Sequence, residues 1–564
     1  MAYINNNKIK GLGGIKRAYL NNTLIFQAFK KNEEVISPYD ITSTFNVTST
    51  TSPTQLCNIT KAFTEMYADG VKIDVSSGYT FNATGEHTVN YVLADKTKIG
   101  SSTYQSCSAL TLVNIYDSVT RIHSYAFSKC TSLTSVTIPD SVINIGYGAF
   151  ASTPFYNNLP NGDVYLGSCY FKYKGTMPSK TSITIKDGTN GICDYAFQNC
   201  SGLTSVTIPD NVTTIDMYAF KNCYRLKSVK IGNNVTTIGI ESFYQCSGLT
   251  SVIIPESVIS IGERAFAYCS GLTSVTIPSS VSSIDGSAFT NTPFYNNLPN
   301  GDVYLGSCYF KYKGTMPINK SITIKDGTKS ISSYAFQNCS GLTSVTIPSS
   351  VSSIGIGAFY DCSGLTSVTI PDSVTTISMN TFYNCSGLKY MDIPSSVSSI
   401  GGSAFYGCSG LTSVTIPESV TSIGGSAFYG CSSLKSITLP QNFSSNIGPS
   451  TFAGCTSLTE IVIPDSVPSI SGGSVFSGCT SLQKVTIGSG VTSIGTSSSF
   501  LSKSIFTGCT KLREITCLAQ TAPTLLTKSI QGIENNGGTL YVPQGSDYST
   551  WKAILTTWNV QYLT

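Results

Sequence analysis

The stretch Ala196–Pro209, AFQNCSGLTSVTIP, occurs a second time without change at Ala335–Pro348. An active site needs one copy of its chemistry, whereas a stacking unit needs many copies of its shape. Around both copies the chain repeats a phrase of about 23 residues, roughly I-G-x-x-A-F-x-x-C-S-G-L-T-S-V-T-I-P-x-S-V-T-S. A fixed period of roughly 20–50 residues is typical of solenoids and other repeat arrays. The repetition therefore predicts the fold more directly than the function.

Each repeat contains one predicted strand, which is Leu203–Pro209 in the first quoted copy. Leu203, Val206 and Ile208 are predicted to face the interior, and Ser205 and Thr207 alternate with the last two and face outward. The proline ends the strand because it has no N–H to donate to the ladder. Val212 and Ile215 then offer a second inward pair, and a turn around the next Ala-Phe pair closes the coil.

One such coil cannot bury its own apolar side, but stacked coils cover one another and join their strands into one long parallel sheet. The sequence therefore predicts an α/β-type repeat solenoid, mostly β, with parallel strands. Its core would contain a column of phenylalanines, one from each coil, at Phe127, Phe150, Phe197, Phe220, Phe243, Phe266, Phe289, Phe336, Phe359, Phe382, Phe405, Phe428, Phe452, Phe476 and Phe506.

Most of the 19 cysteines also recur at one position of the repeat, as in Cys200, Cys223 and Cys246. One cysteine per unit indicates a packing position for a small buried side chain. In-register neighbours about 4.8 Å apart with parallel Cβ vectors are poorly placed for a disulfide. We expect reduced structural thiols, and a metal ladder or a disulfide chain are the alternatives.

The phrase AFxxCxxLTSVTIPxSVTSIG resembles the BspA-like leucine-rich repeat family, over about residues 85–545. The resemblance implies a right-handed leucine-rich-repeat rod and a role in surface adhesion or recognition, with no catalytic residues. The tail LYVPQGSDYSTWKAILTTWN, Leu540–Asn559, is similar to the closing segment of these proteins.

We divide the chain into an N-terminal attachment segment, 1–40, a linker and β-rich N-terminal cap, 41–95, a solenoid, 96–517, and a C-terminal cap, 518–564. Ser/Thr-rich residues 41–54 indicate the linker, and GYTF and GEHTVNYVL, at 78–81 and 85–93, indicate strands of the cap. Residues 18–26 are predicted to form a short hairpin. Residues 1–40 resemble the N-terminal segments of some virion proteins encoded by gut bacteriophages.

Two insertions interrupt the solenoid at 153–178 and 292–317, and they are identical over 26 residues. Each lengthens the phenylalanine step from 23 to 47 residues and replaces the cysteine by a Thr-Pro pair. Asn-Gly followed by alternating apolar and polar residues indicates a hairpin-like excursion. The alternative is a decorated coil that only adjusts the curvature.

Composition excludes several classes of partner. The apolar content of 41% is sufficient for a core, while charged residues make up 11% with a net charge of +4. No basic stripe indicates nucleic acid, and no apolar run is long enough for membrane insertion. The opening lysines are not followed by an apolar block, so we do not expect a secretory signal there.

The sequence contains no recognisable catalytic or cofactor motif. Its two histidines, His87 and His123, lie in different regions and are expected to be structural. No phosphate loop, HExxH or CxxC pair occurs, and the abundant serines follow from the repeat. We therefore expect no enzyme activity, no cofactor and no metal site.

Candidate binding residues are tyrosines and departures from the Ser/Thr pattern of the strand face. A tyrosine directly after the phenylalanine in four successive coils would form an aromatic ladder suited to sugars or to a protein partner, unless the rings only pack on one another. The candidates are Tyr360, Tyr383, Tyr406 and Tyr429 on the coils, Tyr390 and Asp392 on the strand face, and Tyr170, Tyr173, Tyr309 and Tyr312 in the insertions.

The function predicted first is a non-enzymatic, tail-associated bacteriophage virion protein that recognises a glycan or protein on the host cell surface. Residues 1–40 would contact other virion proteins and the solenoid would contact the host. A cell-surface adhesin of a bacterium or protist is the main alternative, and a passive structural or decoration protein of a virion is another. A homo-oligomer is conceivable, although no coiled-coil heptad supports a trimer.

Overall fold

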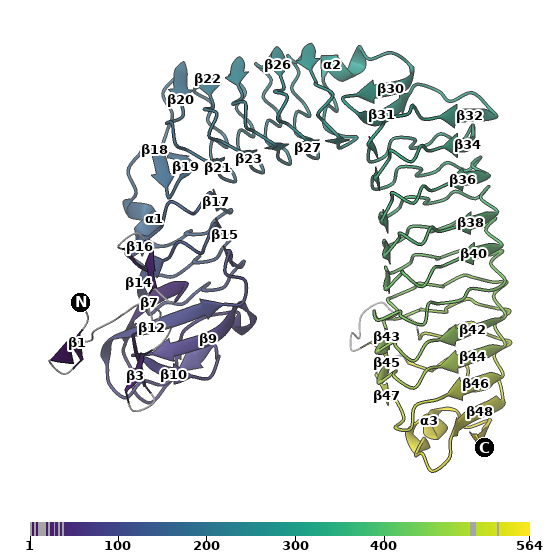
Figure 1. The fold of residues 1–564 in the computed structure, drawn as a ribbon. Helices are drawn as coiled ribbons and strands as arrows, with labels where there is room; N and C mark the ends of the chain where they lie inside the picture. Colours follow the sequence, from purple (N-terminus) through teal and green to yellow (C-terminus); the bar gives the residue numbers. More distant parts are fainter. Residues whose placement is uncertain are drawn as a thin grey trace. The chain divides into compact units, whose positions relative to one another are not determined.

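The computed structural model describes residues 39–496, 504–526 and 529–563, together with the backbone of six short strands within residues 1–38. The chain forms two compact units: unit 1 comprises Met1–Thr276 and Ala288–Asn296, and unit 2 comprises Ile277–Ser287 and Asn297–Thr564. Each unit contains stacked coils with parallel strands and few helices (Figure 1). The predicted fold class, a mostly-β repeat solenoid, is confirmed.

Each regular coil contributes two short strands that pair in parallel with the equivalent strands of the next coil. Ser205 pairs with Ser228 in the first ladder, and Thr214 pairs with Thr237 in the second. The sequence predicts one long sheet, whereas the structure has two ladders, each broken into segments. The reason is the proline after the first strand, which stops that strand and lets the following Thr-Ile pair form a strand of its own.

In unit 1 the first ladder contains β14 (Leu110–Ile115), β16 (Ser135–Thr137), β20 (Thr181–Thr184), β22 (Leu203–Thr207), β24 (Ser228–Lys230), β26 (Ser251–Ile253) and β28 (Ser274–Thr276). The second ladder contains β13 (Lys98–Ile99), β15 (Arg121–Ile122), β17 (Asn144–Ile145), β19 (Cys169–Lys174), β21 (Gly191–Ile192), β23 (Thr214–Ile215), β25 (Thr237–Ile238) and β27 (Ser260–Ile261).

In unit 2 the first ladder contains β32 (Lys320–Thr323), β34 (Leu342–Thr346), β36 (Ser367–Thr369), β38 (Tyr390–Asp392), β40 (Ser413–Thr415), β42 (Glu460–Ile463), β44 (Lys484–Ile487) and β46 (Glu514–Cys517). The second contains β29 (Ser283–Ile284), β31 (Cys308–Lys313), β33 (Ser330–Ile331), β35 (Ser353–Ile354), β37 (Thr376–Ile377), β39 (Ser399–Ile400), β41 (Ser422–Ile423), β43 (Ser469–Ser471), β45 (Ser493–Gly495) and β47 (Thr524–Leu525).

The N-terminal cap is an antiparallel sheet joined directly to the first coil. Its strands are β7 (Ile41–Val47), β9 (Phe63–Ala68), β10 (Val71–Ile73) and β12 (Gly85–Leu93), and β7 lies between β12 and the coil strand β14. A smaller pair, β8 (Thr54–Gln55) and β11 (Gly78–Tyr79), and one 3-10 turn, Thr60–Ala62, complete it. The predicted strand 85–93 is confirmed.

The predicted linker at 41–54 is wrong for its first half. Ile41, Phe45 and Val47 are buried together with Ser43, and Thr42, Thr44 and Asn46 alternate with them on the more exposed face of β7. The Ser/Thr content suggested a linker, but β-branched threonines in a period of two fit a half-buried strand.

Before this sheet, residues 1–38 contain three antiparallel pairs: β1 (Tyr3–Ile4) with β2 (Asn7–Lys8), β3 (Ala18–Leu20) with β4 (Thr23–Phe26), and β5 (Phe29–Lys31) with β6 (Glu34–Ile36).

The phenylalanine column forms the centre of the core in both units. In unit 2 Phe359, Phe382 and Phe405 stack with ring centroids 5.3 and 5.4 Å apart and nearly parallel planes, and each ring is fully buried. In unit 1 Phe220 and Phe243 stack in the same way, 5.0 Å apart. The predicted column is confirmed.

The cysteine column is also confirmed, since all 19 cysteines are buried. Burial raises the pKa of Cys408 to about 12, so the thiol stays protonated. Its Sγ lies 3.0 Å from the carbonyl oxygen of Phe382 in the preceding coil, and Cys385 reaches Phe359 at 3.1 Å. The Phe382 carbonyl also accepts the backbone N–H of Cys385, which follows it in the chain. One carbonyl thus accepts from the cysteine of its own repeat and from the cysteine of the next repeat. The sequence indicated the packing role but not this hydrogen bond.

The two insertions are excursions with a short helix and a hairpin. In the first, α1 (Pro154–Asn158) is followed by β18 (Gly162–Leu166), which pairs antiparallel with β19. Buried Thr153 caps α1, accepting from Tyr156 N at 3.1 Å, and donates to Phe150 O at 2.7 Å. The second has α2 (Pro293–Asn296) and a hairpin of β30 (Gly301–Leu305) with β31. The predicted hairpins are confirmed, and β19 also enters the second ladder beside β21.

The last coil is covered by β48 (Gly538–Pro543), α3 (Ser549–Ile554) and β49 (Trp558–Leu563). Trp551 and Trp558 are buried there, and their indole N–H groups donate to carbonyls of Pro523 and Ile533 at 3.1 Å.

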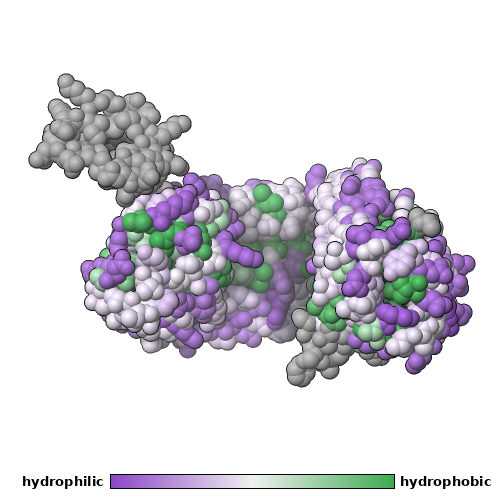
Figure 2. Space-filling view, turned by 90° about the horizontal axis from the view of Figure 1, so that it is seen from below, coloured by the Kyte–Doolittle hydropathy of each residue, from purple (hydrophilic) through white to green (hydrophobic). Residues whose placement is uncertain are grey.

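Hydrophilic and near-neutral residues cover most of the face in Figure 2, with hydrophobic residues in small patches. In the described residues no helix is long and apolar enough to span a bilayer.

Candidate functional site

The repeated serines and threonines of the strand face have a structural cause. Thr343 Oγ1 donates to the carbonyl of Lys320 at 3.1 Å, and Thr366 Oγ1 donates to that of Thr343 at 3.0 Å. These hydroxyls connect neighbouring coils, so they do not indicate a ligand. The two departures predicted as binding residues, Tyr390 and Asp392, are exposed on β38, and Tyr390 retains 61% of its surface.

Tyr360, Tyr383, Tyr406 and Tyr429 form a stack on four successive coils of unit 2. Neighbouring ring centroids are 4.5 Å apart and the planes differ by at most 5°. Both faces of Tyr383 and Tyr406 are therefore covered by other rings, and a ligand meets their edges and hydroxyl groups. Partial burial, together with the neighbouring phenols, raises the pKa of both.

The tyrosines of the excursions divide into two kinds. Tyr170 and Tyr309 are fully buried: they stack on Phe197 and Phe336 at 4.3 and 4.6 Å. Their hydroxyls donate to Asp163 and Asp302 of the same hairpins at 2.7 and 2.8 Å. A surface ligand does not reach these two rings. Within the predicted set, Tyr173 and Tyr312 are half-buried and remain accessible.

His87 is held through both ring nitrogens, as expected of a structural histidine, whereas Nε2 of His123 is buried without a hydrogen-bond partner among the described residues. His87 Nδ1 lies 2.6 Å from Asp69 Oδ2, and its Nε2 lies 2.9 Å from the carbonyl of Ala83. Burial lowers the pKa of His123. In the described parts of the chain no three His, Cys, Asp or Glu side chains gather where they could hold a metal ion.

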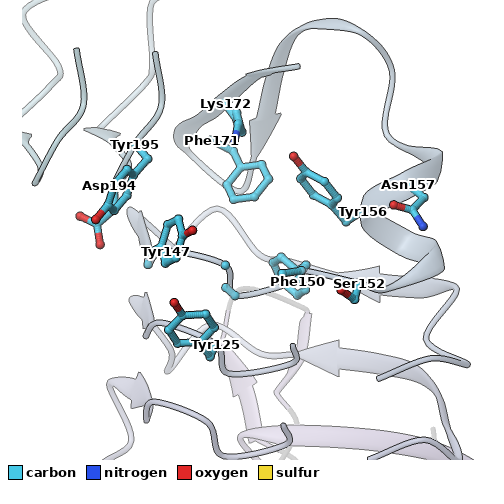
Figure 3. Close-up of a pocket in the computed structure, with 14 residues that line it drawn as sticks. Tyr125, Tyr147, Phe150, Ser152, Tyr156, Asn157, Phe171, Lys172, Asp194 and Tyr195 are labelled. Atoms are coloured by element: carbon cyan, nitrogen blue, oxygen red, sulfur yellow. The ribbon is translucent and has the colours of Figure 1, made fainter. Parts of the chain in front are cut away.

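A cavity of about 560 Å³ in unit 1 was not predicted from the sequence (Figure 3). It opens where the first excursion separates the coil of Phe150 from the coil of Phe197. Its walls come from three places: coil turns before the excursion, the excursion itself, and the turn after β21. The side chains labelled in Figure 3 are Tyr125, Tyr147, Phe150, Ser152, Tyr156, Asn157, Phe171, Lys172, Asp194 and Tyr195.

Six of the fourteen residues that line the cavity are aromatic. Tyr147 and Tyr195 lie 4.5 Å apart between ring centroids, and Tyr125 meets Tyr147 edge to face at 5.4 Å. On the other side Tyr156 from α1 and Phe171 from β19 face the same space (Figure 3). Tyr147 is 44% exposed, so the cavity is accessible from solvent.

Polar groups also line the cavity, and several of them lack an internal partner. Across the described residues, the hydroxyls of Tyr147 and Tyr156 and the side-chain amide of Asn157 have no hydrogen bond within the chain. Lys172 supplies one amine and Asp194 one carboxyl group. Burial raises the pKa of Asp194 to about 7, and the neighbouring Asp216 carboxylate adds to this shift.

The aromatic wall continues along unit 1 beyond the cavity. Tyr195 stacks on Tyr218 at 4.6 Å, and Lys221 Nζ lies 4.7 Å from the centre of the Tyr218 ring. Further along, Arg264 lies over the ring of Tyr244 at 4.7 Å. We call this surface the unit 1 aromatic stripe and define it by Tyr125, Tyr147, Tyr195, Tyr218, Tyr244 and Tyr268.

Glu241 fixes the two cations of the stripe. This carboxylate, which is largely buried, accepts from Lys221 at 2.6 Å and from Arg264 at 2.9 Å. Each cation is thereby held over an aromatic face, an arrangement that adds about 0.5–2 kcal/mol per contact. The stripe is consequently an ordered surface of rings and paired charges.

A family model described as "BspA type Leucine rich repeat region", in six copies, matches residues 97–175, 165–296, 304–431 and 376–512. The chain belongs to this family. The match covers well over half of the chain, and it confirms the family resemblance seen in the repeat. BspA-type repeats typically build scaffolds for binding and adhesion. No curated protein matches the chain.

Two similar solved structures are a leucine-rich cell surface protein from Faecalibacterium prausnitzii and a leucine-rich repeat protein from Bacteroides ovatus. The first is 26% identical, with 70% of this chain and 95% of that chain covered and a TM-score of 0.28. The second is 22% identical, with coverage of 86% and 90% and a TM-score of 0.22. TM-scores this low carry no argument, so the family assignment depends on the repeat itself.

Proposed function

We propose that this chain is a non-enzymatic recognition protein that attaches to a cell surface through its solenoid. The observation that carries the proposal is the unit 1 aromatic stripe. Aromatic rings, with arginine, dominate the energetics of protein recognition surfaces, because they bury large areas at small entropic cost. The BspA-type scaffold supports the same role, since it presents one continuous surface built from many coils.

We propose further that the cell is a bacterial host and that the carrier is a bacteriophage tail. In this setting residues 1–40 contact other virion proteins, and the solenoid contacts a host glycan or protein. The support is the resemblance of residues 1–40 to segments of phage virion proteins and the presence there of short antiparallel pairs unlike the parallel ladders. Immunogold labelling with an antibody to the chain tests the location: label on tail structures supports this setting, and label confined to bacterial cell walls replaces it with the adhesin alternative.

The attachment itself is tested with fluorescently labelled full-length chain on a panel of bacterial strains. We expect saturable binding to at least one strain, reduced at least about tenfold by Tyr125→Ala combined with Tyr268→Ala, because hot-spot residues carry most of the binding energy. Tyr562→Ala, an exposed tyrosine outside the stripe, is the matched control. Absence of binding to every strain, or equal binding by the stripe variant, overturns the proposal.

The tyrosine stack of unit 2 is proposed as a second contact surface that presents ring edges and hydroxyls. Replacing Tyr383 and Tyr406 together by alanine would then reduce the binding of a strain recognised by the wild type. A smaller loss is expected than for the unit 1 stripe, because the faces of these two rings are already covered. Unchanged binding removes the stack from the recognition surface.

A further inference from the structure

The unit 1 cavity is lined by residues of the first excursion, which recur in the second, and by residues of the flanking coils, several of which do not. The excursion 153–178 supplies Tyr156, Phe171 and Lys172, and the same residue types recur in the excursion 292–317. The coil side differs. At the positions corresponding to Tyr147 and Asp194, 139 residues further on, the chain has Gly286 and Ser333. The phenol of Tyr147 and the carboxyl group of Asp194 therefore occur only in the coils that flank the first excursion.

Two of the three coil-side tyrosines, Tyr125 and Tyr195, occupy turn positions that are unfavourable for large residues. Tyr125 and Tyr195 have φ of 59° and 60°, in the left-handed region. The same turn position holds Gly148 and Gly357 in other coils, with φ of 61° and 58°. Glycine adopts this conformation without strain, whereas a bulky residue there costs on the order of 1 kcal/mol or more. The backbone accordingly does not require these rings, and their effect is to build the aromatic wall.

The cavity's charges exclude several ligand classes. Lys172 is the one basic residue that lines the cavity, so there is no cluster of cations for a phosphate or a nucleotide. A purely apolar ligand would bury the Asn157 amide and the hydroxyls of Tyr147 and Tyr156 without a partner, which costs several kcal/mol. The remaining class is a neutral molecule with apolar faces and hydrogen-bonding groups around its edge.

A pyranose ring has this chemistry. Its C–H faces suit the electron-rich faces of aromatic rings, and its hydroxyls suit a few polar groups on the rim. The volume of about 560 Å³ is within the range of small-ligand sites. The unpartnered hydroxyls of Tyr147 and Tyr156 and the amide of Asn157 border the space that a sugar would fill (Figure 3).

We infer that the unit 1 cavity binds a neutral sugar residue, with Tyr147, Tyr156 and Phe171 contacting the ring faces and Asp194, Asn157 and Lys172 bonding its hydroxyls. The inference rests on the proposed function, which it deepens: the sugar is an accessible residue of a cell-surface polysaccharide. The remainder of the unit 1 aromatic stripe then extends from the cavity and lies beside the rest of the glycan chain.

The experiment is isothermal titration of the full-length chain with methyl glycosides of glucose, galactose, mannose and N-acetylglucosamine. We expect at least one glycoside to bind with a dissociation constant in the millimolar range or tighter. Tyr147→Ala and Asp194→Ser are each expected to weaken binding at least about tenfold, and Tyr224→Ala, an exposed tyrosine of the same unit outside the cavity, to change it less than about twofold. Asp194→Ser introduces the residue that the chain has at Ser333, and the circular dichroism spectrum of each variant checks folding.

A second arm uses whole cells and separates the source of the sugar. If the glycoside that binds also competes with labelled chain for cells, the natural ligand is the surface polysaccharide; if the glycoside binds without competing, the cavity takes a free sugar and the polysaccharide part of the inference is overturned. If no glycoside binds at 20 mM (roughly the weakest affinity of interest), or if both cavity variants bind like the wild type, the sugar site is overturned. Cell binding that persists in Tyr147→Ala leaves the proposed function standing without this site, whereas a chain that binds no cells contradicts the proposed function itself.

Discussion

Replacing Phe382 by alanine tests whether the coils share one continuous core. Phe382 is fully buried and stacks on Phe359 and Phe405 at 5.3 and 5.4 Å. Truncating a buried phenylalanine costs about 3–5 kcal/mol through lost apolar burial and the cavity that remains. The two stacking contacts, each worth about 0.5–1.5 kcal/mol beyond burial, place the expected loss in the upper part of that range.

The loss should be local, because each coil of a solenoid contacts only its neighbours. Hydrogen exchange with mass spectrometry therefore measures it better than a global melting curve, since long repeat arrays need not unfold in two states. Peptides from the coils of Phe359 to Phe405 should exchange at least about 100-fold faster than in the wild type, since about 1.4 kcal/mol corresponds to a factor of ten. Peptides around Phe476 should change little.

Two variants calibrate this experiment. Phe382→Leu keeps an apolar side chain and removes the stacked ring, so its effect should fall well below that of the alanine variant. Tyr390→Ala, on the exposed strand face of the next coil, should change exchange by less than about threefold. If Phe382→Ala and Tyr390→Ala have similar effects, the phenylalanine column does not stabilise the coils and the argument for a shared core fails.

Two further predictions concern buried polar groups. The Cys385 thiol donates to Phe359 O at 3.1 Å. If this bond stabilises the solenoid, Cys385→Ser should be at least as stable as Cys385→Ala in denaturant titrations. If the cysteine only packs, the free energy of unfolding of the serine variant should be about 1–3 kcal/mol lower than that of the alanine variant, because the buried hydroxyl would lack a partner. Burial raises the pKa of Asp194 to about 7 and that of Asp216 to about 6. Because both folded-state values lie above the ordinary carboxyl value, folded unit 1 binds protons more tightly than the unfolded chain, and its stability should fall as pH rises from about 4 to 7 and level off above. Asp216→Asn removes one buried acid and lowers the pKa of the other, so the difference between thermal midpoints at pH 5 and pH 8 should shrink by at least half; an unchanged difference would contradict the assignment of these two groups.

The repeat determined the core because neighbours in a solenoid are related by one period. A residue's position in the phrase therefore specifies what it touches, and Phe382 stacks on the residues one period before and after it. The Leu and Val positions, the cysteine column and the strand at 85–93 followed from the same reasoning or from alternation. The linker prediction failed at Ile41–Val47 because composition was weighed above the alternating pattern.

The binding surfaces could be predicted only in part. The period indicated that Tyr360 to Tyr429 fall in one line, but not that their rings would stack face to face and cover one another. Tyr170 looked like its neighbour Tyr173, yet it occupies the phenylalanine column and is fully buried. Ring orientation depends on the backbone at each turn, which residue identity alone does not specify.

The sequence by itself determined the family, the coil and the columns of the core, since each depends on a pattern that recurs at a constant step. Only the tertiary structure placed Tyr147 against Tyr195, 4.5 Å apart, across an excursion that breaks that step. Across the excursion, residues one period apart in the sequence are not neighbours in space. Which side chains meet there depends on how the inserted helix and hairpin hold the flanking coils apart. The unit 1 cavity formed at that break for this physical reason, and its lining could not be predicted from the repeat.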